Sequence, residues 1–295
     1  MAETSTSTAM DPDLQDPQGF LAMAQQHYEN FPVGSWLLPR PARRHLHRIY
    51  AFARTADDLA DERQDRAALD AFRAEFLRHE DPAVRDVALF AELFASIREC
   101  DLDLALFVDL LDAFDQDCHQ TRYSRPELLD YCMRSADPIG RLVLRVCGYR
   151  EDRLDEWSDY VCTGLQLVNH LQDLKEDLIE RDRVYFPVEE LEACGACVDD
   201  LRADRASPAV RRFVLEQADR VGRDLARGWP LVGAVRGRLR LELRAILRGA
   251  AAVLAKIRAA DGDVLGRDVR LSKAARARTV FAGLLLRGEP RWGAS

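Results

Sequence analysis

The chain has 295 residues, of which 47% are hydrophobic, and it carries a formal net charge of −8. A chain of this length can bury the core of one large helical domain, which we favour over two smaller domains. The negative charge disfavours nucleic acid and anionic lipid as main partners, because both attract basic surfaces, so an anionic substrate would need metal ions or local arginines.

The predicted elements begin after a polar tail. Residues 1–18 are rich in Ser, Thr, Asp, Gln and Pro and lack an apolar period, so we expect them to be disordered, ahead of one helical domain over residues 19–288. Apolar residues recur three and four apart over residues 43–62, which is a helical period, and Pro39 and Pro41 mark its start. Further helical periods cover residues 67–78, 83–99, 103–119, 126–149, 152–181, 208–227 and 236–260.

Local signals support several of these helices. Ser124 and Glu127 have the spacing of a capping box, and Ser207 with Pro208 predicts an N-cap before an N1 proline. Pro138 should break or kink the helix that contains it, because proline lacks the backbone donor and clashes one turn back. Alternating β-branched strands and the motifs GxGxxG and GxxxxGK are missing from the sequence. The sequence therefore predicts an all-α fold and disfavours nucleotide-binding folds.

The cysteines indicate a reducing compartment. Seven cysteines are scattered through the periodic segments, and no apolar signal-peptide core is found near the N-terminus. This pattern predicts free thiols in a cytoplasmic protein. Cys194 and Cys197 form a single CxxC pair without a second pair or a spaced histidine, so we interpret them as a helix end running into a turn rather than as a zinc site.

The C-terminal third is basic and amphipathic. Its richest apolar run, residues 280–286, is too short to span a bilayer. The basic residues before this run leave open a peripheral contact with the inner face of the membrane, although such a pattern more often forms one solvated face and one core face. These basic residues are Arg267, Arg270, Lys273, Arg276 and Arg278.

Two acidic stretches far apart in the chain are its most informative feature. Asp57 and Asp61 lie four residues apart in the first stretch, and Asn169, Asp173 and Asp177 have the same spacing in the second. Residues four apart share a helix face, so each set presents oxygen ligands in a short row. We name these sets the first and the second acidic row.

The chemistry of the rows suits magnesium and phosphate. Carboxylate and amide oxygens without histidine or thiolate partners favour Mg²⁺, which binds one or two carboxylates together with substrate phosphate. Facing rows around a diphosphate would stabilise the charge that develops as a carbon–oxygen bond breaks, leaving pyrophosphate and a carbocation. The structural alternative is a pair of solvated faces with Arg63 and Lys175 as ion-pair partners, since a chain with 32 aspartates contains such spacings by chance.

With these residues in view, the sequence resembles the squalene and phytoene synthases, which join prenyl diphosphates head to head, over about residues 20–288. The resemblance implies an all-α isoprenoid synthase fold, a single-domain helical bundle around a central apolar cavity capped by Mg²⁺ ions and diphosphate. Five motifs in the family's order carry it: residues 27–39 (HYENFPVGSWLLP), 49–61 (IYAFARTADDLAD), 131–132 (YC), 166–177 (QLVNHLQDLKED) and 183–187 (RVYFP).

The resemblance also implies roles for individual residues. The first and second acidic rows match the two aspartate-rich motifs of the family and would hold the metal, and Tyr131 would line the cavity beside the reacting carbons. Aromatic faces that stabilise a cation would come from Phe31, Tyr50, Phe52 and Tyr131, although any one aromatic residue is more often plain core packing. The substrate-binding residues implied are His27, Phe31, Tyr50, Arg54, Gln166, Arg183 and Tyr185.

Two segments depart from the usual pattern of phytoene and dehydrosqualene synthases. Where those enzymes carry His-Ser-Lys-Ser-Phe, residues 27–31 read His-Tyr-Glu-Asn-Phe, so a lysine and two serines that help hold diphosphate are missing. The usual apolar Val-Ala-Gly-x-Val-Gly is replaced over residues 135–140 by Ser-Ala-Asp-Pro-Ile-Gly. Ser135 and Asp137 would thus stand near the cavity wall and position a water molecule.

Both departures are similar to the bacterial hydroxysqualene synthases of squalene and hopanoid biosynthesis. Such an enzyme ionises presqualene diphosphate with Mg²⁺, lets the cyclopropylcarbinyl cation rearrange and captures it with water, so no NADPH is expected. It would be paired in function with a presqualene diphosphate synthase.

Two alternatives stay open. In the same class, the protein would condense two prenyl diphosphates to presqualene diphosphate, dehydrosqualene or phytoene. In a different class, a helical domain of this fold would serve as a non-catalytic assembly protein.

Overall fold

The structure is a computed structural model that describes residues 38–62 and 65–293, without the side chains of residues 61 and 62. Over these residues it is built from helices, and the only β-type pairing is a single bridge between Arg122 and Val184. The all-α expectation is confirmed. The elements are α2 Arg40–Asp57, η4 Asp58–Glu62, α3 Arg66–Arg78, α4 Ala88–Cys100, α5 Leu104–Asp117, α6 Arg125–Ser135, α7 Asp137–Val146, α8 Asp152–Arg181, α9 Val188–Ala193, η5 Val198–Arg202, α10 Pro208–Gly228, α11 Pro230–Ala234, α12 Gly237–Ala259 and α13 Lys273–Leu285.

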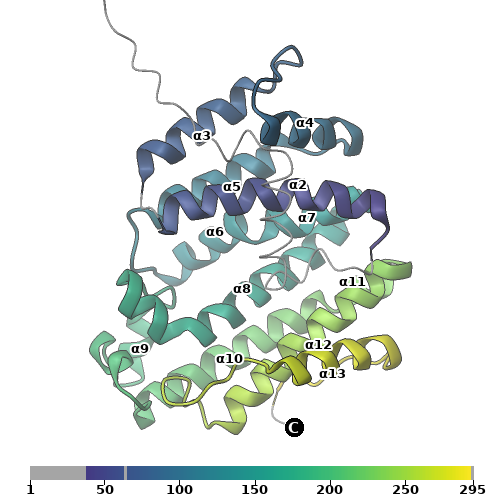
Figure 1. Cartoon of the computed structure of the whole chain (residues 1–295). Coiled ribbons are helices and arrows are strands. Elements are labelled where there is room, and N and C mark those ends of the chain that lie inside the picture. Colours follow the sequence, from purple (N-terminus) through teal and green to yellow (C-terminus); the bar gives the residue numbers. More distant parts are fainter. Residues whose placement is uncertain (1–37, 63–64, 294–295) are drawn as a thin grey trace, which may run out of the picture.

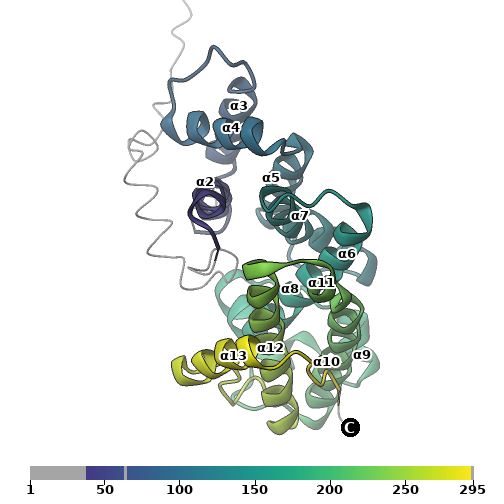
Figure 2. The same ribbon diagram turned by 90° about the vertical axis from the view of Figure 1, so that its right-hand side faces the viewer.

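The long helix α8 organises the bundle. It packs against α7 on one side and α10 on the other, while α12 pairs with α13 (Figures 1 and 2). Gly164 lets α10 approach α8 closely, because a Cβ at this position would stand 2.6 Å from Leu225 Cδ2. At the far end of the molecule α2 packs against α4, with α5 and α7 between α2 and α8 (Figure 2).

Aromatic residues fill the core between α2, α3 and α5. Phe52 is fully buried, and its ring centroid lies 4.9 Å from that of Phe76 and 5.4 Å from that of Phe107. Burial of each such ring contributes roughly 2 to 3 kcal/mol to folding. Phe52 is therefore accounted for by core packing rather than by a role at the site.

The local signals are confirmed where they can be compared. Ser124 and Glu127 form the capping box of α6, and the Ser207 side chain caps α10 ahead of Pro208. The helix predicted over residues 126–149 is broken at Ala136, so that Pro138 begins α7 within its first turn. All seven cysteines are free thiols, and Cys194 caps the end of α9.

One prediction is wrong in its local geometry. The helix that begins at Arg40 does not stay α-helical to Glu62, because it widens into a π-helix from Asp58. The sequence places acidic residues four apart at 57 and 61 and again at 58 and 62, and like charges at this spacing destabilise a regular α-helix.

Among the described residues, no helix is both long enough and apolar enough to cross a membrane.

Candidate active site

The first acidic row lies where α2 passes into η4. Arg54 donates from Nη1 to Asp57 Oδ2 at 3.0 Å and lies 2.6 Å from Asp58 Oδ1 through Nη2. Tyr50 stands one turn before Arg54 and is half-buried, and burial raises the pKa of its phenol. The structure gives the backbone of Asp61 in η4 but not its side chain. Asp57 and Asp58 therefore share the guanidinium of Arg54. The four-residue spacing predicts Asp57 and Asp61 as the first acidic row, and the structure adds Asp58 to it.

The second acidic row lies on α8, whose bounds match the prediction. Asn169 is exposed, Asp173 is partly exposed, and Asp177 is 15% exposed at its side chain. Gln166, three residues before Asn169, is half-buried on the same helix. Asp177 lies 3.7 Å from Arg181 Nη1 and 4.0 Å from His170 Nδ1. The row is thus a graded face that runs from solvent at Asn169 toward the interior at Asp177.

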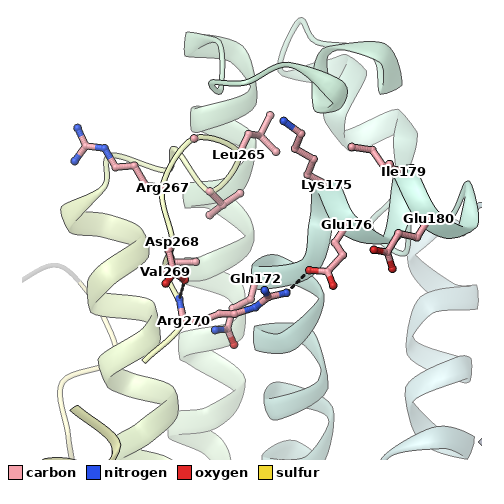
Figure 3. Close-up of a pocket in the computed structure, with 12 residues that line it drawn as sticks. Gln172, Lys175, Glu176, Ile179, Glu180, Leu265, Arg267, Asp268, Val269 and Arg270 are labelled. Carbon is pink, nitrogen blue, oxygen red and sulfur yellow. Dashed lines mark hydrogen bonds and ion pairs between the residues drawn. The ribbon is translucent and has the colours of Figure 1, made fainter. Parts of the chain in front are cut away.

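A loop between α12 and α13 covers part of the second row. Arg270 reaches from this loop to form ion pairs with Asp173 and Glu176, and the contact with Glu176 is drawn in Figure 3. The loop and α8 enclose a surface groove of about 490 Å³, which Gln172, Lys175, Ile179 and residues 264–270 line. Lys175 instead bonds Ala203 and Asp204, so Arg270 rather than Lys175 pairs with Asp173 of this row.

The two rows lie toward the same end of the molecule. The C-terminal ends of α2 and α8 both point to the left in Figure 1. Within the described part of the chain, a group of three metal-binding side chain types whose ligand atoms lie within 4.8 Å of one another is found elsewhere, at Glu75, His79 and Asp86. Arg78 already pairs with both carboxylates of that group, so a metal ion there would have to displace this guanidinium.

A buried polar network surrounds Asp117, at the end of α5. Tyr131 donates its hydroxyl to Asp117 Oδ2 at 2.7 Å, and Tyr185 donates to Oδ1 at 3.2 Å. Arg183 donates from Nη2 to the Asp117 carbonyl at 2.6 Å and from Nη1 to the Tyr185 hydroxyl at 2.8 Å. Burial and the Asp117 charge raise the pKa of the Tyr131 phenol well above its usual value. Tyr131, Arg183 and Tyr185 are thus brought together by Asp117.

His170 closes this network from the side of α8. Its ring stacks on that of Tyr185 at a centroid distance of 3.7 Å, and the ring is almost fully buried. Burial, reinforced by the charge of Arg183, lowers the pKa of His170 to about 3, so the imidazole is neutral at physiological pH. A neutral aromatic ring here links the second acidic row to the tyrosines.

Asp137 lies at the start of α7 and faces α8. Its side chain accepts a hydrogen bond from Thr163 Oγ1 at 2.9 Å, and Thr163 lies one turn before Gln166. Burial, together with the nearby charge of Asp159, raises the pKa of this carboxyl to about 7. The Ser135 hydroxyl at the end of α6 is buried and has no hydrogen-bond partner in the part of the chain that the structure describes. Two polar groups with unused capacity thus flank the break between α6 and α7.

The sequence reading missed Asp117, His170 and the pairing role of Arg270. A signal for Asp117 existed, because it continues the buried face of α5 through Leu106, Leu110 and Ala113, where a carboxylate needs buried partners. In the sequence Arg270 is one of several basic residues before the apolar run, and its spacing gives no sign of the partners on α8. His27 and Phe31 lie outside the described residues.

The donor set fits a divalent cation with diphosphate. The side chains of Asp57, Asn169, Asp173 and Asp177 offer oxygen atoms and no thiolate, and at least partly exposed arginines pair with carboxylates of both rows. Ion pairs with partly exposed arginines contribute only about 0 to 1 kcal/mol, so these carboxylates can exchange an arginine for another cation at small cost.

Comparison with known proteins agrees with this arrangement. Residues 24–275 match the squalene/phytoene synthase family. A hydroxysqualene synthase of Rhodopseudomonas palustris is 36% identical over 227 residues, which cover 74% of this chain and 75% of the relative. A phytoene synthase of Thermus thermophilus is 31% identical over 274 residues, which cover 91% of each chain.

A solved structure supports the fold as well. The squalene synthase HpnC from Alicyclobacillus acidocaldarius superposes with a TM-score of 0.74 at 37% identity, covering 83% of this chain and 95% of that chain. The match of the family over most of the chain, together with the acidic rows and the tyrosine network, shows that the protein belongs to the squalene/phytoene synthases.

Proposed function

We propose that this protein is a hydroxysqualene synthase, which converts presqualene diphosphate and water to hydroxysqualene and diphosphate with Mg²⁺ and without NADPH. The family accounts for the isoprenoid diphosphate chemistry, and the relative from Rhodopseudomonas palustris supports this particular reaction. The carbon–oxygen bond to diphosphate breaks, and the resulting cyclopropylcarbinyl cation rearranges. Water then forms the new carbon–oxygen bond and loses one proton.

The observation that favours hydration of the cation over condensation of two substrates is the buried carboxyl of Asp137. It is a buried carboxyl where phytoene synthases usually have an apolar residue, and its bond to Thr163 points it at the helix that bears the second acidic row. With a pKa of about 7, this carboxyl accepts a hydrogen bond from water and takes up its proton in the physiological range. Ser135, two residues earlier in the chain, supplies a buried hydroxyl.

The other residues bind the metal and the diphosphate and shield the cation from bulk water. Asp57, Asp61, Asn169, Asp173 and Asp177 would hold Mg²⁺, which supplies neutralisation of the diphosphate charge when bound. Arg54 stands beside the first row to contact diphosphate, with Tyr50 one turn away and Gln166 on α8. Tyr131 and Tyr185 present aromatic faces, which stabilise a cation while the surrounding apolar residues exclude bulk water.

The decisive experiment supplies purified protein with presqualene diphosphate and Mg²⁺ in the absence of NADPH. We expect an alcohol and diphosphate as products, and either squalene or no turnover would refute the proposal. Asp137→Leu should lower alcohol formation relative to other products, because it removes the group that holds water.

A second candidate is a condensing enzyme that forms presqualene diphosphate, dehydrosqualene or phytoene. The phytoene synthase of Thermus thermophilus favours it, because that relative covers more of the chain. Turnover of farnesyl or geranylgeranyl diphosphate alone would support this reading. If the protein were a non-catalytic assembly protein, Asp57→Ala and Asp173→Ala would leave its function intact.

A further inference from the structure

The C-terminal helix α13 presents an apolar face away from the bundle. Gly283 is buried against α12, where an added Cβ would stand 2.7 Å from the backbone of Ala245. Residues two positions apart on a helix differ by about 200° in direction. Phe281 and Leu285 lie two positions before and after Gly283, so they point away from α12. Phe281 is 63% exposed and Leu285 61% exposed, which agrees with this geometry.

The exposed face is continuous rather than scattered. Leu286 is 54% exposed beside it, and a surface groove of about 540 Å³ runs along α13, lined by Ala277, Arg278, Phe281, Ala282, Leu285 and Leu286. Contiguous exposed apolar patches of this kind mark interaction surfaces more often than singly exposed residues do.

An arginine cluster stands at the end of this face. Arg244 and Arg248 on α12 donate to the carbonyl of Leu286, and Arg248 also donates to that of Gly288. Arg244 is only 7% exposed, and its burial, with the charges of Arg240, Arg287 and Arg248, lowers the pKa of its guanidinium. Among the described residues, none of these four arginines forms an ion pair with a carboxylate. A concentrated positive charge of this kind attracts anions.

The charge around α13 contrasts with that of the whole chain. Residues 236–287 hold thirteen Arg and Lys against four Asp and Glu, whereas the full chain has a net charge of −8. The helix α13 itself contains Lys273, Arg276 and Arg278 and no acidic residue. Exposed apolar residues flanked by cations on one helix face are typical of helices that lie in the interface of an anionic bilayer.

We propose that α13 docks this protein on the surface of an anionic phospholipid bilayer. Phe281, Leu285 and Leu286 enter the headgroup and acyl boundary, and the partly exposed Arg248 and the exposed Arg287 bind lipid phosphates beside them. This surface is separate from the acidic rows, so the inference does not depend on the reaction that the protein catalyses.

The test is flotation of the full chain with vesicles. Binding is expected to vesicles that contain phosphatidylglycerol and to be at least tenfold weaker to pure phosphatidylcholine. Raising the salt from 0.1 to 0.5 M should weaken binding, because it screens the arginines. Equal binding to both vesicle types, or binding that salt does not change, would overturn the role of the arginines.

Two sets of variants separate the apolar and charged contributions. Phe281→Ser with Leu285→Ser should lower vesicle binding tenfold or more, and Arg248→Gln with Arg287→Gln should lower it by about fivefold for each arginine. Matched controls are Met133→Ser, an apolar residue 56% exposed on α6, and Arg227→Gln, an exposed arginine that pairs with Asp224. These controls should bind like the parent chain, and a loss in them equal to that in α13 would overturn the proposal.

The oligomeric state distinguishes lipid from a second copy of the chain. Light scattering of the parent protein and of the Phe281→Ser, Leu285→Ser variant should give the same mass, with unchanged circular dichroism and melting temperature. A parent dimer that becomes a monomer in this variant would assign the face to self-association and refute the membrane proposal.

Discussion

The Asp117 network and the acidic rows are both made of charged groups, but they are held in opposite ways. Asp117, Tyr131, Arg183 and Tyr185 are buried and bond one another, so their charges are satisfied by the fold itself. The carboxylates of the rows are partly exposed and rest on arginines that also face solvent, such as Arg54 and Arg270. The fold fixes the network permanently, whereas the rows keep a compensating charge that a ligand can replace.

The largest effect should follow from breaking the buried network. Asp117→Ala removes the carboxylate that accepts from the Tyr131 and Tyr185 hydroxyls and that lies 3.4 Å from Arg183 Nη1, and we expect a loss of about 3 to 5 kcal/mol in the free energy of unfolding. Urea denaturation measures it. Asp115→Ala is the matched control: Asp115 lies on α5 with Asp117 but pairs with exposed Arg66 of α3, so its loss should cost less than about 1 kcal/mol. Equal losses in the two variants would abolish the distinction between network and surface.

The expected effect of Asp137 on the free energy of unfolding comes next in size, and it depends on pH. Because the folded protein raises this pKa from 3.8 to about 7, the folded state holds a proton that the unfolded state releases between these values. The free energy of unfolding should therefore fall as pH rises from about 4 to 7, by up to about 4 kcal/mol from this group. Asp137→Asn should flatten that part of the profile. A variant whose profile matches the parent's would show that Asp137 titrates normally.

Tyr131→Phe probes one bond of the network. It removes the hydroxyl that Asp117 Oδ2 accepts at 2.7 Å but keeps the ring, so we expect a loss of about 1 to 2 kcal/mol. Thermal unfolding followed by circular dichroism gives the measurement. Tyr160→Phe, on a half-buried tyrosine of α8 outside the network, serves as the comparison and should change stability less.

The smallest effect on stability should come from the second acidic row. Asp173→Asn removes a partly exposed ion pair with Arg270 and should change the free energy of unfolding by less than about 1 kcal/mol. Turnover should nevertheless fall at least a hundredfold if Asp173 holds the metal, and isothermal titration should show weaker Mg²⁺ binding. Full activity in this variant would remove Asp173 from the site.

The helices were largely predictable from the sequence because their apolar period is regular. The bounds of α8, for example, match the prediction, and the break near Pro138 follows from the chemistry of proline. The π-helix at Asp58–Glu62 was not predictable, since the period of apolar residues continues through it. The acidic rows could be found by spacing, but Arg270 and Asp117 reach their partners from distant segments, which a single sequence does not reveal.

The spread of the Asp117 network along the chain has a consequence for the order of folding. Tyr185 lies 68 residues from Asp117 and Arg183 lies 66, so these bonds close long loops. Contacts of such separation form only after the intervening helices have docked, because loop closure must precede them. We expect the near-ultraviolet signal of the tyrosines to return in the slowest refolding phase, after far-ultraviolet helicity has recovered. A chain caught before that step would be helical throughout yet would lack the interior that its chemistry needs.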